Sequence, residues 1–303
     1  MARSGTSALT RLLSLCGGAL PGGMVGGLVD NPLGYWEPRK AVYLNEEILR
    51  RHGSAGNDAS LRMQEEGAFD AEERAACISK IGAYLTTLPT APLVVIKELQ
   101  VTALSGMWFE AARLAGFDVT TVIAVRHPQQ VIASFAKRGT GTSKELSGAL
   151  WLKYSLLAER DTRGVPRVFV EYANLLDDWR REVQRISAAL AIDLNTRDEA
   201  AIEEFLKQDL QHQRHSGSET ELFGTDWFSA VYETLRAAAR DEPWDGSALD
   251  RVFEAYQASE QTFRTAFEDF HRHQKLSRVI RPSITRLALE VVAMAHRRKG
   301  TWA

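Results

Sequence analysis

Cysteine is scarce in this chain of 303 residues, which contains only Cys16 and Cys77. Two cysteines cannot build a disulfide framework, so a reducing, cytoplasmic compartment is the expected location. The histidines and cysteines also lack the spacing of metal ligands, and we expect no metal site.

Long hydrophobic runs and an excess of one charge are missing as well. No apolar run approaches the length of a bilayer-spanning helix, and residues 1–20 lack the layout of a signal peptide. The 37 basic and 39 acidic residues leave a formal charge of −2, so nucleic acid is not an expected partner and any anion site must be local. The 45% hydrophobic content suffices for one large α/β domain or two smaller ones.

A polar, glycine-containing turn at residues 2–9 precedes an apolar periodic segment that predicts a helix, and Gly17 and Gly18 stop that helix. The first amides of a helix lack backbone partners and lie at the positive end of its dipole, which favours an anion. A plain serine-rich helix cap is the alternative. The turn offers a permissive glycine, a fixed positive charge and three hydroxyls, namely Gly5, Arg3, Ser4, Thr6 and Ser7.

Short apolar runs alternate with helical patterns in the middle of the chain. They predict strands at 93–96, 119–125 and 167–170, and this alternation indicates a parallel sheet with helices on both sides. Ligands bind such sheets at the carboxyl ends of the strands. Six residues follow these strand ends, namely Lys97, Glu98, Arg126, His127, Glu171 and Tyr172.

The remaining segments are predominantly helical. The predicted helices span residues 41–52, 71–88, 103–115, about 128–138, 143–162, 176–190, 198–209, 226–240 and 248–274. A polar loop between two of them carries His212, Arg214 and His215, which either are solvated or approach a ligand.

A second group of polar residues follows the strand at 119–125. Arg126 ends that strand, Pro128 suits a first helical position, and Ser134 lies eight residues after Arg126. Gln130 and Arg138 share the helix face of Ser134. A strand-end arginine beside a helix-borne serine is suited to binding one phosphate, and a solvated polar face is the alternative.

Together these motifs resemble those of sulfotransferases that use 3′-phosphoadenosine-5′-phosphosulfate. Residues 3–7 with the following leucine-rich helix resemble the 5′-phosphosulfate loop of that family. Residues 125–128, with Ser134, resemble its 3′-phosphate motif. The similarity spans about residues 1–220, in the family's order.

Three further segments resemble the bacterial carbohydrate-type branch of the family, namely residues 31–38 (Asn-Pro-Leu-Gly-Tyr-Trp-Glu-Pro), the strand end at Lys97, and residues 172–179. The resemblance implies a three-layer, P-loop-like α/β fold, with a central parallel sheet flanked by helices and a helical C-terminal part. We expect a sulfotransferase-like domain at 1–275 and a basic amphipathic helix at 276–303.

The resemblance also implies roles for single residues. The amides and hydroxyls of residues 4–7 would hold the 5′-phosphate and sulfuryl oxygens, and Arg3, where many relatives have a lysine, would neutralise the leaving phosphate. Arg126 and Ser134 would bind the 3′-phosphate. Sulfuryl transfer needs in-line positioning and stabilised leaving-group charge, as phosphoryl transfer does.

A general base must take the proton of the acceptor hydroxyl. Glu37 is the expected base because related carbohydrate enzymes use an acid from the corresponding loop, with Glu98 and His127 as alternatives. Lys97 would either polarise the sulfuryl group or form an ion pair.

The sequence departs from the family pattern at two places. Relatives have a strand before the first loop, whereas only Met1 and Ala2 precede Arg3 here. Either the recorded start is too late, or the loop lacks its usual anchor and binding is weakened. Residues 97–100 are Lys-Glu-Leu-Gln where many relatives have Lys-Asp-Pro-Arg, so contacts there are expected to differ.

The leading hypothesis is sulfuryl transfer from this nucleotide to a hydroxyl of a glycan or glycoconjugate. The rival is a non-catalytic relative that binds nucleotide, glycan or a partner protein. A nucleotide-dependent kinase is disfavoured because no Walker lysine follows Gly5. The acceptor and the oligomeric state stay open. Three tryptophans provide either sugar-stacking faces or core packing, namely Trp36, Trp108 and Trp151.

The chain ends in an apolar stripe from Ile284 to Ala295, followed by Arg297, Arg298 and Lys299. Such a helix either covers the core or touches an anionic membrane surface. The Arg-Lys-Gly at 298–300 matches a segment of cytosolic sulfotransferases by chance, because its context differs.

Overall fold

The computed structural model describes residues 3–27, 31, 33–137, 142–196, 198–210 and 226–279, with the backbone alone at 208–210 and 266–279. The chain divides into two compact units, Met1–Glu254 and Ala255–Ala303. The elements, in order, are α1 (Thr6–Leu15), α2 (Arg39–Arg51), η1 (Arg62–Gln64), α3 (Ala71–Leu85), η2 (Leu99–Leu104), α4 (Ser105–Leu114), β1 (Thr121–Val125), α5 (Pro128–Lys137), α6 (Lys144–Asp161), β2 (Arg167–Glu171), α7 (Tyr172–Asp177), α8 (Trp179–Leu190), α9 (Glu199–Leu210), α10 (Trp227–Ala238) and α11 (Gly246–Val279).

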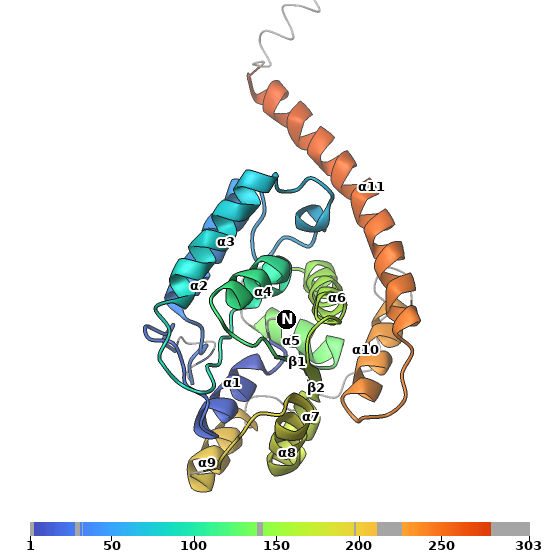
Figure 1. Cartoon of the computed structure of the whole chain (residues 1–303). Coiled ribbons are helices and arrows are strands. Elements are labelled where there is room, and N and C mark those ends of the chain that lie inside the picture. Colours follow the sequence, from blue (N-terminus) through green and yellow to red (C-terminus); the bar gives the residue numbers. More distant parts are fainter. Residues whose placement is uncertain are drawn as a thin grey trace, which may run out of the picture. The chain divides into compact units, whose positions relative to one another are not determined.

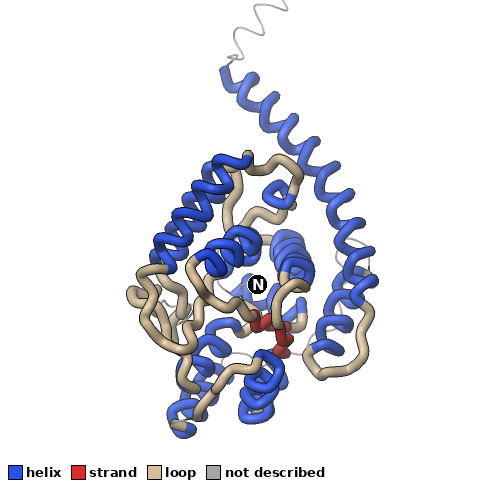
Figure 2. Tube along the Cα trace, in the orientation of Figure 1, coloured by secondary structure: helices blue, strands red, loops and turns tan. Residues whose placement is uncertain are grey.

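The sheet consists of β1 and β2, which lie side by side among the helices of the first unit (Figures 1 and 2). They are parallel, with Thr121 opposite Arg167 and Val125 opposite Glu171. The chain between them passes through α5 and α6. Two of the predicted strands are therefore confirmed, and the described part of the chain is a mostly helical α/β structure with parallel strands.

The strand predicted at 93–96 is reduced to a single parallel bridge between Ala19 and Val94. The Ala19 amide donates to the Leu93 carbonyl at 2.9 Å, and the Val95 amide donates to the Ala19 carbonyl at 2.8 Å. The next donor in this direction would be residue 21, a proline, which has no N–H. The pairing therefore stops after one bridge.

Most predicted helices are present, with two differences at their boundaries. The helix expected at 103–115 is preceded by η2, because the Glu98 carboxylate accepts from the amides of Gln100 and Val101 and caps this tight turn. The helix expected at 176–190 is divided at Asp178, whose side chain caps α8 by accepting from the Arg181 amide at 3.1 Å.

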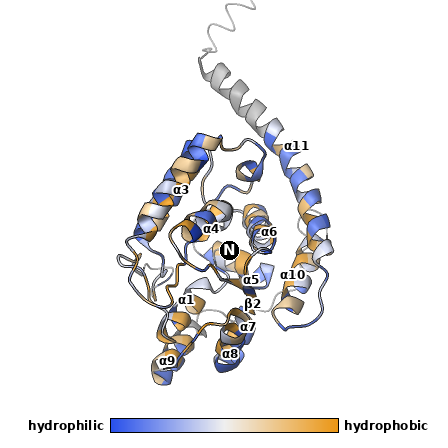
Figure 3. Cartoon of the chain, viewed as in Figure 1, coloured by the Kyte–Doolittle hydropathy of each residue, from blue (hydrophilic) through white to orange (hydrophobic). Residues whose placement is uncertain are grey.

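The core of the first unit contains two main hydrophobic clusters. One packs α1 against β2, α7, α8 and α9, and the other joins α2, α3 and α4. In α8 the apolar side chains of Val183, Ile186 and Leu190 are buried, and Figure 3 shows hydrophobic and hydrophilic residues mixed along this helix. Each such side chain contributes about 1.5–3 kcal/mol on burial.

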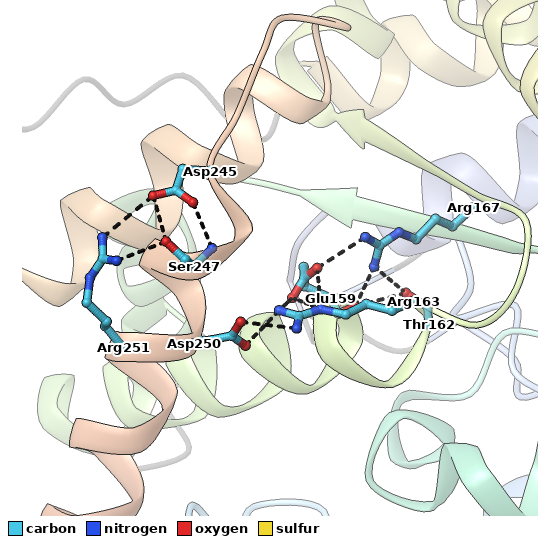
Figure 4. Close-up of polar contacts among 8 residues, drawn as sticks. All are labelled: Glu159, Thr162, Arg163, Arg167, Asp245, Ser247, Asp250 and Arg251. Atoms are coloured by element: carbon cyan, nitrogen blue, oxygen red, sulfur yellow. Dashed lines mark hydrogen bonds and ion pairs between the residues drawn. The ribbon is translucent and has the colours of Figure 1, made fainter.

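An ion cluster joins α6 to the first residue of β2 and to the start of α11 (Figure 4). Its centre is Glu159, whose side chain is 1% exposed. Arg163 approaches this carboxylate at 2.7 Å, and Arg167 approaches it at 3.2 Å. Arg163 also pairs with Asp250 at 2.8 Å. The cluster therefore fastens α6 to the amino end of the sheet.

Several predicted features lie outside the described residues, namely Arg138, the loop with His212, Arg214 and His215, and the C-terminal segment from 280 onward. The boundary between the two compact units falls inside α11. The domain boundary expected at 275/276 stays a prediction. Within the described ranges, no helix combines the length and apolar character needed to cross a bilayer.

Candidate functional site

The turn before α1 has an unusual backbone. Gly5, at the N-cap of α1, has a φ of 81°, and Arg3 has a φ of 65°. Both values lie in the left-handed region, which is costly for a residue other than glycine. Ser4 is fully buried, and its hydroxyl has no hydrogen-bond partner among the described residues. The turn therefore places a buried hydroxyl at the amino end of a ten-residue helix, beside Thr6 as the first helical residue.

Arg126 follows the carboxyl end of β1 and reaches this turn. Its side chain is buried, and its Nη1 donates to the main-chain oxygen of Arg3 at 2.7 Å. Its Nε donates to Oε1 of Gln130 at 3.1 Å. The main-chain oxygen of Arg126 in turn accepts from the Trp151 indole at 3.1 Å. The strand end and the turn are thus joined directly.

Ser134 lies on α5 and meets the same turn from another element. Nε of Arg3 donates to the Ser134 hydroxyl at 2.8 Å, across 131 positions of sequence. The two motifs that the sequence assigns to the two ends of one nucleotide are therefore in contact. Arg3, Arg126 and Ser134 form one polar cluster at the start of α1.

A second cluster adjoins α1 through Ser7. The Ser7 hydroxyl donates to the main-chain oxygen of Tyr35 at 3.2 Å, and Nζ of Lys97 donates to the same oxygen at 2.9 Å. Lys97 also forms an ion pair with Glu37, and the two side chains are only 10% and 12% exposed. The structure thus brings Glu37 and Lys97 together and links them to the turn through a peptide oxygen, which no pattern of side chains reveals.

Burial perturbs the charges in this second cluster. Desolvation lowers the pKa of Lys97, and the neighbouring Glu37 carboxylate opposes that shift. Desolvation also raises the pKa of Glu98 to about 7, against the lowering effect of its hydrogen bonds to the Gln100 amide and Asn45. Because Oε2 of Glu98 already accepts from Asn45 and from the amides of Gln100 and Val101, this residue holds local structure.

Two further residues on the same strand ends, His127 and Glu171, contact α10. The Tyr232 hydroxyl donates to Oε1 of Glu171 at 2.5 Å. The His127 ring packs edge-on against the Tyr232 ring with centroids 4.7 Å apart, and its Nδ1 accepts from the Gln129 amide at 3.3 Å. These contacts fasten α10 to the sheet edge and involve His127, the other alternative for the base.

The three tryptophans divide between core and site. Trp108 and Trp151 are buried, and they bond to Asn45 and to the Arg126 main chain respectively, so both serve packing. Trp36 lies between Tyr35 and Glu37, has a φ of 56°, and carries the Arg11 guanidinium over its ring at 4.8 Å.

The arrangement combines cationic side chains, hydroxyls and a helix N-terminus beside the partly buried Glu37 carboxylate. These are the groups of an anion site with a proton acceptor. Within the described ranges, no group of three or more histidine, cysteine or acidic residues is placed to hold a metal ion. Scans of the chain against models of known protein families, against curated proteins and against solved structures found no match.

Proposed function

We propose that this protein is a sulfotransferase that moves a sulfuryl group from 3′-phosphoadenosine-5′-phosphosulfate to a hydroxyl of a glycan or glycoconjugate, on a P-loop-like fold. One observation carries the proposal, namely the 2.8 Å hydrogen bond between Arg3 and Ser134. It joins two separate motifs, each suited to a phosphate, into one site. A nucleotide with phosphates at both its 5′ and 3′ positions needs such a pair.

The donor fits the chemistry of the residues. The amides and hydroxyls of residues 4–7 would hold the 5′-phosphosulfate, and the buried Ser4 hydroxyl has no other partner among the described residues to satisfy it. Arg126 and Ser134 would bind the 3′-phosphate. Arg3 lies between the two groups, since its side chain bonds Ser134 while its main chain belongs to the turn.

The transfer follows from charge placement. The acceptor oxygen attacks sulfur, the bond from sulfur to the 5′-phosphate oxygen breaks, and the acceptor proton passes to the Glu37 carboxylate. Arg3 stabilises the negative charge that develops on the leaving phosphate. Lys97, held between Glu37 and the Tyr35 oxygen, would face the sulfuryl group from the same cluster.

The alternative is a non-catalytic protein that binds the nucleotide or a glycan. The observation that favours it is the ion pair that already engages Glu37 with Lys97. The two functions differ in turnover and agree in donor binding, so both quantities must be measured.

Titration calorimetry of the full chain with adenosine 3′,5′-bisphosphate tests the donor site. We expect binding by the wild-type protein and at least about a tenfold loss of affinity in Arg126→Ala, because charged hydrogen bonds are worth roughly 1.5–3 kcal/mol. Arg180→Ala, on the exposed face of α8, removes the same charge and should bind normally. Absence of binding by the wild-type protein would overturn the proposed function.

A transfer assay with sulfur-labelled donor and a panel of glycans then separates the two functions. Formation of a labelled glycan would show that the protein is a sulfotransferase. Donor binding at normal affinity without transfer to any acceptor favours the non-catalytic alternative.

A further inference from the structure

Gly5, in the turn at residues 3–5 before α1, is in close contact with the ring of Tyr172 from α7. A Cβ atom placed on Gly5 would lie 2.1 Å from Cδ2 of Tyr172 and 2.8 Å from its Cγ and Cε2. Atoms of a side chain never approach a Cβ so closely, so any other residue at position 5 displaces the ring or the turn. Tyr172 therefore fills the space beside Gly5.

The same ring also contacts the arginine that binds the turn. The guanidinium of Arg126 lies over the Tyr172 ring at 4.7 Å from its centroid, and Nη1 of Arg126 donates to the main-chain oxygen of Arg3 at 2.7 Å. The Tyr172 ring thus packs against Gly5 and also contacts Arg126, whose guanidinium donates to the main chain of Arg3 in the same turn.

Tyr172 is itself held firmly. It is 4% exposed, directly follows β2 as the first residue of α7, and belongs to the core cluster that contains Ala8 and Leu9 of α1. A rigid strand end thus determines where the ring lies. The turn needs such support, because Arg3, two residues before Gly5, adopts left-handed backbone that is costly for a residue other than glycine.

We propose that Tyr172 is a positioning residue that holds residues 3–5 in their anion-binding conformation, by packing against Gly5 and by orienting Arg126. The identity of the anion rests on the proposed function, whereas the support of the turn does not. In this role Tyr172 acts through its ring, which packs against Gly5 and lies under the Arg126 guanidinium.

The first test measures packing and needs no ligand. Gly67 is the matched control for Gly5, because its φ is 79° against 81° and a Cβ there would meet nothing within 4 Å. We expect Gly5→Ala to lower the melting temperature more than Gly67→Ala, since both acquire backbone strain and only the first meets the ring. The excess should vanish when Gly5→Ala is made in a Tyr172→Ala background. Equal shifts in the two single variants would overturn the proposal, even if Tyr172→Ala does not fold.

The second test measures adenosine 3′,5′-bisphosphate affinity by calorimetry, at a temperature where every variant is folded. We expect Tyr172→Phe to bind like the wild type and Tyr172→Ala to bind at least tenfold more weakly. Tyr84→Ala, which removes a buried ring from the other main core cluster, should destabilise the fold and leave affinity unchanged. Equal weakening in Tyr172→Ala and Tyr84→Ala would contradict a positioning role. If the wild type does not bind, the proposed function fails and the melting comparison still decides the packing role.

Discussion

Two clusters that contain arginines lie at opposite ends of the same small sheet, and they are built differently. At the amino end, both carboxylate oxygens of Glu159 accept hydrogen bonds from Arg163, and Oε1 also forms an ion pair with Arg167. At the carboxyl ends, Arg126 and Arg3 donate to the Arg3 main-chain oxygen, to the amide oxygen of Gln130 and to the Ser134 hydroxyl. The first cluster is thus centred on a carboxylate, whereas the second joins two arginines to neutral oxygens of the turn and of α5.

This difference separates a structural cluster from a candidate binding site. A buried cation that is paired with a carboxylate has little to gain from an external anion, because the pairing already offsets its desolvation. Arg3 and Arg126 instead donate to neutral oxygens beside the amino end of α1, where a bound phosphate would accept further charge-assisted hydrogen bonds. The carboxyl ends of the strands are also where ligands bind to parallel sheets.

The largest expected effect is on the structural cluster. Glu159→Ala leaves Arg163 and Arg167 beside a cavity without their common partner, and we expect the free energy of unfolding to fall by about 3–5 kcal/mol. Denaturation in urea measures it. Asp250→Ala removes the more exposed partner of Arg163 and should cost less than about 1 kcal/mol. A similar fall in the free energy of unfolding in both variants would contradict the expected difference between the buried Glu159 and the more exposed Asp250.

The next effect concerns turnover at the other end of the sheet. Glu37→Gln keeps an oxygen for Lys97 and removes the proton acceptor, so we expect kcat to fall about 10²- to 10⁴-fold. Affinity for adenosine 3′,5′-bisphosphate should not change. The measurement pairs a transfer assay with calorimetry. Loss of binding together with turnover would assign Glu37 a structural role.

Glu98 offers a test by pH, because it is a buried carboxylate with a pKa of about 7 against an ordinary value of 4.5. Between these two values the folded protein binds more protons than the unfolded chain, so the free energy of unfolding falls as the pH rises. From pH 5 to 8, the wild type should lose up to about 3 kcal/mol relative to Glu98→Gln. Urea unfolding at both pH values checks this. Parallel profiles for the two proteins would contradict it.

The smallest expected effect is on a single hydroxyl. Ser134→Ala removes one hydrogen-bond partner from the donor site, and we expect adenosine 3′,5′-bisphosphate to bind about tenfold more weakly. Ser147→Ala provides a control, since this buried serine donates to the Ser143 main chain at 2.8 Å and lies in α6. Calorimetry should find its affinity unaltered. An unchanged affinity in Ser134→Ala would contradict a role for the Ser134 hydroxyl in binding the nucleotide.

The sequence predicted β1 and β2 well because each is an apolar run between turn residues. It predicted too long a strand at 93–96, because the pairing depends on Ala19 and Pro21, which lie in a different segment. Strand propensity is a property of one segment, whereas a ladder of backbone hydrogen bonds needs N–H donors on both paired segments. The helix predicted at 176–190 divides at Asp178, whose side chain caps α8, and the helix predicted at 103–115 begins late, after the η2 turn that Glu98 caps.

At the candidate site, the sequence predicted a set of site residues and left the contacts among them unknown. Topology placed Arg126 and Tyr172 on one edge, but only the folded backbone shows that the Tyr172 ring packs against Gly5. The bond from Arg3 to Ser134 spans 131 positions, so no local pattern encodes it. The joint contact at the Tyr35 oxygen was unpredictable for another reason, since every residue carries a main-chain oxygen.

The Tyr35 main-chain oxygen affects what a mutational scan of this protein can detect. Ser7 and Lys97 both donate to the peptide group of residue 35, which persists whatever side chain the residue carries. A scan of side chains at position 35 would therefore register none of this connection. The connection depends instead on the path of the backbone, which turns sharply at Trp36 with its φ of 56°. Proline at position 36, which fixes φ near −65°, would redirect that oxygen and separate α1 from the Glu37–Lys97 pair.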